Sequence, residues 1–360
     1  MLSASAPGRL RVIAPPKMRA PRAVLAPVAF VLALAFLSAS AQAQARADFA
    51  GKTVTIVSSF GPGGGYTIYA QLVARYLGTH LPGRPTVIVR NMPGAGGLSG
   101  TNYLYNVAAR DGTVLGVIPQ TVAIAQALGE GGVKYDVRRF NWIGRVNSNV
   151  EVEQTWHTAA VKTIEDARSK EAILAGTGPE SSSVVFPRIL NDMFGMKLRV
   201  IPGYEGVNMA SLAMEKGEVD GILRPWSVTK TVRPEWLRDK TINLLVQYSL
   251  ARHPELAQVP AVVELAVNEE QRQILGLFAS GSGIGRSIVA PPGVAGEMVA
   301  ALRAGFTETM RDPALVEEAR TSGLDIDPLA GEALQQIVAK TVEVPPGIVE
   351  AAKRFSAPNR

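Results

Sequence analysis

Short apolar runs alternate with longer amphipathic stretches along the chain beyond residue 45. Val54 to Val57 is a β-branched run, and a glycine-rich stretch from Ser58 to Gly65 follows it. The next apolar residues recur at helical spacing: Tyr69, Leu72, Val73, Tyr76 and Leu77. This pattern predicts a strand, a glycine loop and a helix, in that order.

The same three-part unit recurs directly afterwards. Val87 to Val89 is a second apolar run, Pro93 to Gly97 a second glycine loop, and Leu98 to Ala109 a stretch with helical character. Val114 to Ile118 is then typical of a buried strand. Continuous apolar strands that alternate with helices favour a parallel sheet covered on both faces.

A second series of strands and helices occupies the middle of the chain. Its loop, Gly176 to Ser183, leads into a helical stretch from Val184 to Phe194. This series begins after Trp142–Val146, and we expect its strands at Ala172–Ala175, Leu198–Ile201 and Ile242–Val246. Towards the C-terminus, apolar residues at helical spacing predict packing helices: Met298, Leu302 and Phe306 in one, and Leu334, Ile337 and Val338 in another.

The length of the chain predicts two lobes, since domains average about 100 to 200 residues. The glycine-rich stretch 281–285 lies where the chain is expected to return to the first lobe. We therefore expect an α/β protein in which residues 46–148 and 272–360 form lobe 1 and residues 149–271 form lobe 2. Each lobe should be a mainly parallel sheet flanked by helices.

The first 45 residues have the layout of a secretory signal peptide. Five basic residues precede an apolar run from Val24 to Leu37, and small residues follow it at 39–43. A membrane anchor is the alternative, but a helix of about 14 residues spans only about 21 Å, short of a hydrocarbon core of about 30 Å. We expect cleavage after export and a periplasmic location.

Charge and composition narrow the partners. The net charge of +6 includes five positive charges from residues 1–45, so removal of that segment leaves +1. Nothing beyond Ala45 resembles a basic stripe with interleaved aromatic residues, which argues against nucleic acid. The absence of cysteine excludes disulfides, thiolate metal sites, cysteine nucleophiles and a lipid-modified cysteine anchor.

The two glycine loops predict an anion site, because backbone N–H groups at a helix N-terminus favour negative charge. Neither loop has the Gly-Lys-Ser/Thr sequence or the G-x-G-x-x-G pattern of nucleotide sites, since Tyr66 stands where a third glycine is required. Neither contains lysine or arginine, which suits a carboxylate better than a phosphate. The alternative is that the glycines only permit turns.

An enzymatic function lacks an activated group. His80, His157 and His253 are scattered, which favours surface or capping roles, and no Gly-x-Ser-x-Gly sequence occurs. Glu151 and Glu153 stand near the lobe boundary, and their alternate spacing favours a solvated strand edge over paired catalytic carboxylates. We expect no catalysis, no cofactor and no metal.

Several motifs resemble the periplasmic receptors of tripartite tricarboxylate transporters, also called the Bug family. In the first half these are Phe60 to Gly65, Asn91 to Gly97 and Asp111 to Leu115. In the second half they are Gly176 to Ser183, Ile201 to Gly206, Gly217 to Asp220 and His253 to Glu264. The resemblance runs across nearly the whole chain beyond the signal peptide.

The resemblance implies a Venus-flytrap receptor that captures a small organic carboxylate between its lobes and delivers it to membrane transporter subunits. It implies that the first lobe holds a carboxylate near Gly63, Gly64, Gly65, Tyr66, Thr67, Ala95 and Gly96. It implies that the second lobe adds Thr177, Gly178, Ser181 and Ser182, with Tyr204 and Trp226 closing the cleft. A sensor-kinase receptor without transport is the alternative, and we expect a monomer.

Two features of the sequence bear on which carboxylate is bound. Many relatives have an acidic residue shortly after the glycines, whereas this chain has Tyr66 and Thr67, which argues against amino acids. Arg224, which follows a predicted strand, is a candidate for a second ligand carboxylate, although a surface arginine at a strand end is the commoner outcome.

Overall fold

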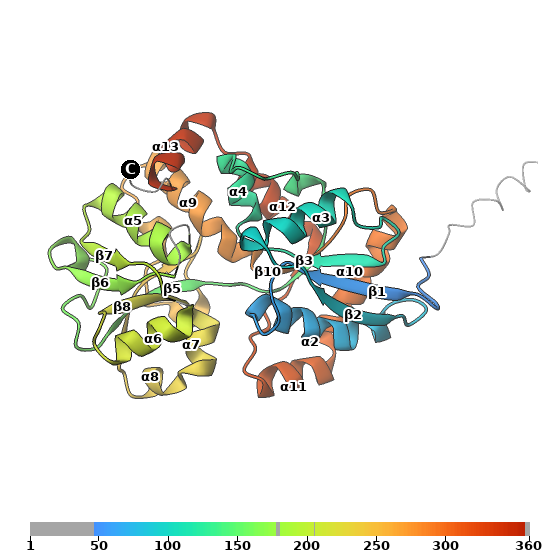
Figure 1. Cartoon of the computed structure of the whole chain (residues 1–360), viewed down its shortest axis with the longest axis horizontal. Coiled ribbons are helices and arrows are strands. Elements are labelled where there is room, and N and C mark those ends of the chain that lie inside the picture. The colour runs from blue at the N-terminus through green and yellow to red at the C-terminus, as the bar shows by residue number, and fades with distance from the viewer. Residues whose placement is uncertain (1–46, 178–180, 205, 357–360) are drawn as a thin grey trace, which may run out of the picture. The chain divides into compact units, whose positions relative to one another are not determined.

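The computed structural model describes residues 47–177, 181–204 and 206–356. Within these residues the first sheet has the strand order β11-β4-β10-β3-β1-β2 (Figure 1). Its strands are β1 (Thr53–Ser58), β2 (Thr86–Asn91), β3 (Val114–Val117), β4 (Asn141–Asn147), β10 (Arg286–Ala290) and β11 (Leu329–Ala330). The predicted strands in this half are confirmed, but β10 was not predicted.

Helices cover both faces of the first sheet. One face packs against α2 (Gly65–His80), α10 (Gly296–Arg311) and α11 (Pro313–Thr321). The other face packs against α3 (Leu98–Asn106), α4 (Val122–Leu128) and α12 (Gly331–Val342). Apolar side chains at helical spacing, such as Leu72 and Leu302, are fully buried between the sheet and these helices.

The second sheet has the order β7-β6-β8-β5-β9. Its strands are β5 (Glu151–Trp156), β6 (Ala172–Ala175), β7 (Leu198–Ile201), β8 (Gly221–Pro225) and β9 (Ile242–Tyr248). Helices α5 (Ser182–Phe194), α9 (Glu269–Ile284) and α13 (Pro346–Ser356) pack on one face, and α6 (Val207–Glu215), α7 (Trp226–Val232) and α8 (Pro234–Arg238) accompany the other. Short 3-10 turns complete the described chain: η1 (Ala95–Gly97), η2 (Val137–Arg139), η3 (Asp166–Arg168), η4 (Pro254–Leu256) and η5 (Val262–Leu265).

Both sheets are mixed, which corrects the expectation of mainly parallel strands. Strands β1, β2 and β3 are parallel, but β10 pairs antiparallel with both β3 and β4. In the second sheet β6, β7 and β8 are parallel, and β5 pairs antiparallel with β8 and β9. The reason is the course of the chain, because β5 begins where the chain leaves the first sheet and β10 begins where it returns.

The two segments that connect the sheets pack closely together. Gly285, between α9 and β10, has φ +54, and a Cβ atom there would lie 2.2 Å from the carbonyl oxygen of Asn147. The amide of Asn149 also donates to the carbonyl oxygen of Ser282. Glycine is therefore required at 285 for the backbones to approach. The lobe boundaries stay a prediction, and α9 and α13 pack with the core of the second sheet.

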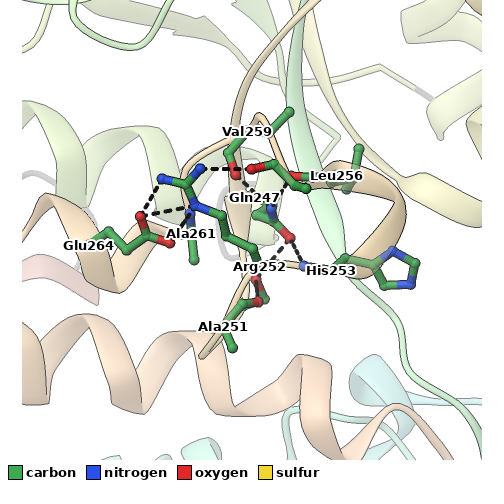
Figure 2. Close-up of polar contacts among 10 residues, drawn as sticks. Gln247, Ala251, Arg252, His253, Leu256, Val259, Ala261 and Glu264 are labelled. Carbon is green, nitrogen blue, oxygen red and sulfur yellow. Dashed lines mark hydrogen bonds and ion pairs between the residues drawn. The ribbon is translucent and has the colours of Figure 1, made fainter.

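The segment after β9, part of one family-like motif, is held by polar contacts (Figure 2). The Nε2 atom of Gln247 donates to the carbonyl oxygens of Leu256 and Val259 at 3.0 and 2.7 Å. Arg252 forms an ion pair with Glu264 at 2.6 Å. These contacts satisfy buried backbone groups of an irregular segment, so this motif has a structural role.

Candidate functional site

The two glycine loops begin side by side at one edge of the first sheet. Ser58 at the end of β1 is the register partner of Asn91 at the end of β2 and of Val117 at the end of β3. Strand β1 lies between β3 and β2. The chain therefore passes from β1 to the neighbour on one side, β2, and then crosses over to the neighbour on the other side, β3. In open α/β sheets ligands bind at such a switch point, outside the carboxyl ends of the strands.

The first glycine loop ends at the N-terminus of helix α2. Gly63 adopts φ +78, Gly64 is the N-cap residue, and no side chain caps the helix. Gly63, Gly64 and Gly65 are all exposed. The N–H groups of the first turn of α2 therefore lack a capping acceptor and carry the positive end of the helix dipole.

Two polar side chains hold this loop from behind. The hydroxyl of Thr67 donates to the carbonyl oxygen of Gly61 at 2.8 Å, and Nδ2 of Asn91 donates to Thr67 and to the carbonyl oxygen of Phe60 at 2.8 and 2.7 Å. Thr67 is fully buried. The structure thus places the Thr67 side chain behind the loop as a support, and its contact with a ligand stays a prediction.

The second glycine loop has an unusual backbone. Ala95 and Gly96 adopt φ +46 and +62, and Gly97 adopts φ +96 at the start of α3. A Cβ atom at Gly97 would lie 2.4 Å from Cγ of Pro119. Gly97 is therefore required for packing, whereas Ala95 and Gly96 are exposed beside the first loop.

Tyr66 is fixed beside both loops. Its ring stacks on Phe60 with centroids 4.3 Å apart, and its hydroxyl accepts a hydrogen bond from the backbone N–H of Gln120 at 3.1 Å. Burial raises the pKa of the Tyr66 hydroxyl, and Arg286 partly offsets this effect. The phenol is therefore neutral at physiological pH and can donate its proton.

Arg286 lies at the same edge of the sheet, and the sequence analysis missed it. It is the first residue of β10, and because β10 runs antiparallel to β3, this residue stands near the carboxyl end of β3. A Cβ atom at Gly65 would lie 3.2 Å from Nη2 of Arg286. The signal in the sequence was one charged residue shortly before an apolar run, Ile288 to Ala290.

The second sheet presents an acidic group at the corresponding edge. Glu151 is the first residue of β5, and its register partner is Pro225 at the end of β8. The hydroxyl of Ser182 at the start of α5 donates to Oε1 of Glu151 at 3.0 Å. Removal from solvent raises the pKa of Glu151 to about 7, although Ser182 and Arg286 act in the opposite direction.

Glu151 and Glu153 are not a solvated edge, which corrects the sequence prediction. Strand β5 lies between β8 and β9, inside the sheet. Glu151 is half-buried and Glu153 is fully buried. Burial raises the pKa of Glu153 to about 8. The alternate spacing was interpreted correctly as a shared face, but that face is turned inward.

Hydroxyl groups surround the start of α5. The backbone N–H of Thr177 donates to the hydroxyl of Ser183 at 3.0 Å, and the hydroxyls of Ser181 and Ser183 lie 2.8 Å apart. Ser181 is the N-cap residue and no side chain caps the helix. Thr177, Ser181 and Ser182 are thus near one helix N-terminus, while the predicted Gly178 lies outside the described residues.

The aromatic residues expected to close the cleft are anchored in the second sheet's own packing. Trp226 is 8 % exposed, contacts Val150 and Val152, and donates from Nε1 to Glu255 at 2.6 Å. Tyr204 is half-buried against the cluster that contains Trp236. A closing role for Tyr204 and Trp226 stays a prediction.

Arg224 is not a surface residue. It is fully buried, and its guanidinium lies over the ring of Trp236 at 5.2 Å. It donates to the hydroxyl of Ser211 at 2.7 Å and to the carbonyl oxygen of Val228 at 3.3 Å. Burial lowers its pKa to about 10. The expectation of a surface arginine is wrong, and the contacts favour a structural role over ligand binding.

The histidines have local structural contacts. His80 forms a hydrogen bond with Asp312 at 2.8 Å, and Nδ1 of His253 accepts one from the backbone N–H of Glu255, as a capping residue does.

In the described parts of the chain, no group of three His, Cys, Asp or Glu side chains could hold a metal ion. In the same residues, no helix is both long and apolar enough to cross a membrane. The predicted signal peptide lies outside them.

Comparison with known families decides the relationship. The model of the tripartite tricarboxylate transporter family receptor matches residues 69–353. The chain belongs to this family. Its members are solute-binding receptors, as the resemblance implied. A search of curated proteins returned no match.

Solved structures confirm the fold of this family member. A TctC solute-binding protein from Polaromonas superposes with a TM-score of 0.65 at 19 % identity, covering 84 % of this chain and 99 % of that one. The periplasmic binding protein BugD superposes at 0.59 and 22 % identity, covering 86 % and 99 %. MatC from Rhodopseudomonas palustris, solved with malate, superposes at 0.58 and 21 % identity, covering 82 % and 98 %. The two-lobed binding-protein fold is therefore confirmed.

Proposed function

We propose that this protein is an exported receptor that captures a small organic carboxylate and delivers it to a tripartite tricarboxylate-type membrane transporter. The observation that carries the proposal is the pair of exposed glycine loops at adjacent strand ends, one of which leads into the uncapped N-terminus of α2. Free amides at a helix N-terminus favour a carboxylate. MatC, a relative in fold, was solved with malate, and another R. palustris protein with adipate.

The residues proposed to contact the carboxylate are those of the glycine loops that are exposed to solvent. The exposed residues Gly63, Gly64, Gly65, Ala95 and Gly96 supply the proposed amide contacts, and Tyr66 lies beside them. From the second sheet, the hydroxyls at the start of α5 offer donors and acceptors to the rest of the ligand. Thr177, Ser181 and Ser182 are the proposed contacts there.

The proposed mechanism is binding with closure of the lobes. A ligand that contacts both lobes stabilises the closed state by its higher affinity for that state, and the membrane partner recognises that state. This role requires no bond to be made or broken, so we infer a receptor without catalytic activity. We also propose that the protein is exported to the periplasm and acts as a monomer.

Thermal unfolding of the protein purified from the periplasm tests this function. The panel contains malate, adipate, citrate, benzoate, amino acids and sugars. A ligand at 100 times its Kd adds about 2.7 kcal/mol to the free energy of unfolding. We expect stabilisation by carboxylates; stabilisation by sugars alone would refute the proposal.

A further inference from the structure

We propose that Arg286 forms an ion pair with the ligand carboxylate at the N-terminus of α2. This proposal rests on the carboxylate-binding function and names the side chain that supplies its charge. The glycine loops themselves contain no cationic residue. Without Arg286, uncharged amides would be the only groups of this site that stabilise the negative charge of the ligand.

Arg286 is buried without a counter-ion at contact distance. Its exposed fraction is 5 %. In the part of the chain that the structure describes, no carboxylate forms an ion pair with it, and its Nε atom has no hydrogen-bond partner. Burial of a cation costs free energy unless an anion or strong acceptors compensate it. A bound carboxylate would provide that compensation.

The guanidinium of Arg286 is directed towards the start of α2. Nη2 and Nε lie 3.2 and 3.5 Å from the position that a Cβ atom of Gly65 would occupy. Gly65 is the first residue of α2, so the guanidinium stands beside the amides that begin the helix. A cation and a helix N-terminus at one place both attract the same anion.

Neighbouring side chains hold the guanidinium of Arg286 in place. It lies 4.8 Å from the ring centroid of Tyr69 and 5.7 Å from that of Tyr66. Nη1 donates to Oδ1 of Asn147 at 3.3 Å. Aromatic faces attract arginine without consuming its N–H donors in hydrogen bonds. The remaining donors are thus oriented in advance for a carboxylate.

The proposed test compares two buried arginines. Arg286→Met removes the cation beside the loops, and Arg224→Met removes one that contacts Ser211 and Trp236. The Kd values of malate, adipate, citrate and benzoate are measured by calorimetry for both variants and the unmodified protein. We expect Arg286→Met to raise the Kd of the tightest-binding acid at least about 30-fold, as for a buried ion pair that loses one partner. Arg224→Met should leave its Kd within about threefold.

The outcomes separate this proposal from the function on which it rests. If the unmodified protein binds acids and Arg286→Met binds them within about threefold, Arg286 is not a ligand residue and the receptor function stands. If the unmodified protein binds only sugars or other uncharged compounds, both proposals fail. Should Arg286→Met not fold, Arg286→Gln replaces it, because glutamine removes the charge and keeps polar hydrogen-bonding atoms; a loss of about tenfold or more supports the ion pair, and a smaller loss overturns it.

Discussion

Each sheet contains an antiparallel strand whose first residue is charged and lies beside a helix N-terminus. In the first sheet Arg286 begins β10 next to Gly65. In the second, Glu151 begins β5 and accepts a hydrogen bond from Ser182. The same construction thus carries opposite charges, with bare amides on one side and hydroxyls on the other. Under the proposed function, the first sheet recognises the negative charge of the ligand and the second recognises the remainder.

The two charged residues are also coupled to each other. Arg286 acts to lower the pKa of Glu151, and both residues affect the pKa of the Tyr66 hydroxyl. Electrostatic effects of this kind fall off with distance. The acidic group is therefore placed to sense the charge of whatever binds beside Arg286.

Blocking the amides on the first side should have the largest effect. Gly64 has an ordinary backbone conformation, φ −74 and ψ 152, and a Cβ atom there would meet only the carbonyl oxygen of Gly61 at 3.6 Å. Gly64→Leu should fold but cover the amides, and we expect at least about a 100-fold loss of affinity for every carboxylate. Calorimetry measures it, with Gly347→Leu in α13 as a matched control because that glycine also faces open space.

An unchanged affinity in Gly64→Leu, with normal thermal unfolding, would remove the first sheet from the recognition of charge and with it the comparison. A variant at Gly96, which has φ +62, would be less informative, because backbone strain and blocking would act together.

The charge on the second side should make binding depend on pH. The pKa of Glu151 is about 7 without ligand. A bound anion raises it further, so binding takes up a proton. Affinity should then be constant well below pH 7 and fall above it, by at most about tenfold per pH unit. Kd values of the tightest-binding carboxylate between pH 6 and 9 measure this effect, and Glu151→Gln should flatten the profile.

Other groups near Glu151 set the control. Arg286, Tyr66 and Ser182 contribute to its environment, and Glu153, with a pKa of about 8, lies two residues along β5. Glu153→Gln should therefore retain the fall that Glu151→Gln removes. Affinity that rises with pH would instead indicate a ligand whose cationic group pairs with ionised Glu151, which would reverse the assignment of the second side.

Removing a hydroxyl on the second side should have a smaller and more selective effect. Ser182→Ala deletes the donor to Glu151, and we expect about a two- to tenfold change in Kd, the usual range for one hydrogen bond. The ratio of the Kd values for malate and adipate should change, because the second side contacts the rest of the ligand. Ser169→Ala, at an exposed position, is the control. An equal loss for both acids would contradict the division of roles.

The smallest effect is expected away from both charged residues. Lys230 on α7 pairs with Glu255 at 2.7 Å and with Asp325, after α11, at 2.9 Å. Partly exposed ion pairs contribute at most about 1 kcal/mol. Lys230→Met should therefore change Kd by no more than about fivefold, and a larger change by calorimetry would place a major determinant of binding outside the two sheet edges.

The sequence predicted the parts of this site that depend on local pattern. The glycine loops follow apolar strands, and their place at a helix N-terminus was recognisable because glycine, strand and helix signals occur in succession. The strands Ala172–Ala175 and Leu198–Ile201 match the structure at both ends for the same reason. The parallel part of each sheet follows from the alternation of strands and helices.

The charged residues could not be predicted in this way. Arg286 follows Gly285 and precedes an apolar run, and only the antiparallel pairing of β10 with β3 brings it to the glycine loops. Glu151 is half-buried because strand β5 lies inside the second sheet and the start of α5 brings Ser182 against it. Arg224 is buried by residues distant in sequence, Ser211 and Trp236. Pairing between distant segments has no local signal in a single sequence.

A crystal structure with the tightest-binding carboxylate tests the central claim most directly. The account predicts one carboxylate of the ligand within about 3 Å of an amide at the start of α2 and of the Arg286 guanidinium, with the remainder directed towards Ser182 and Glu151. A ligand bound elsewhere, or one whose carboxylate contacts neither the α2 amides nor Arg286, would contradict it.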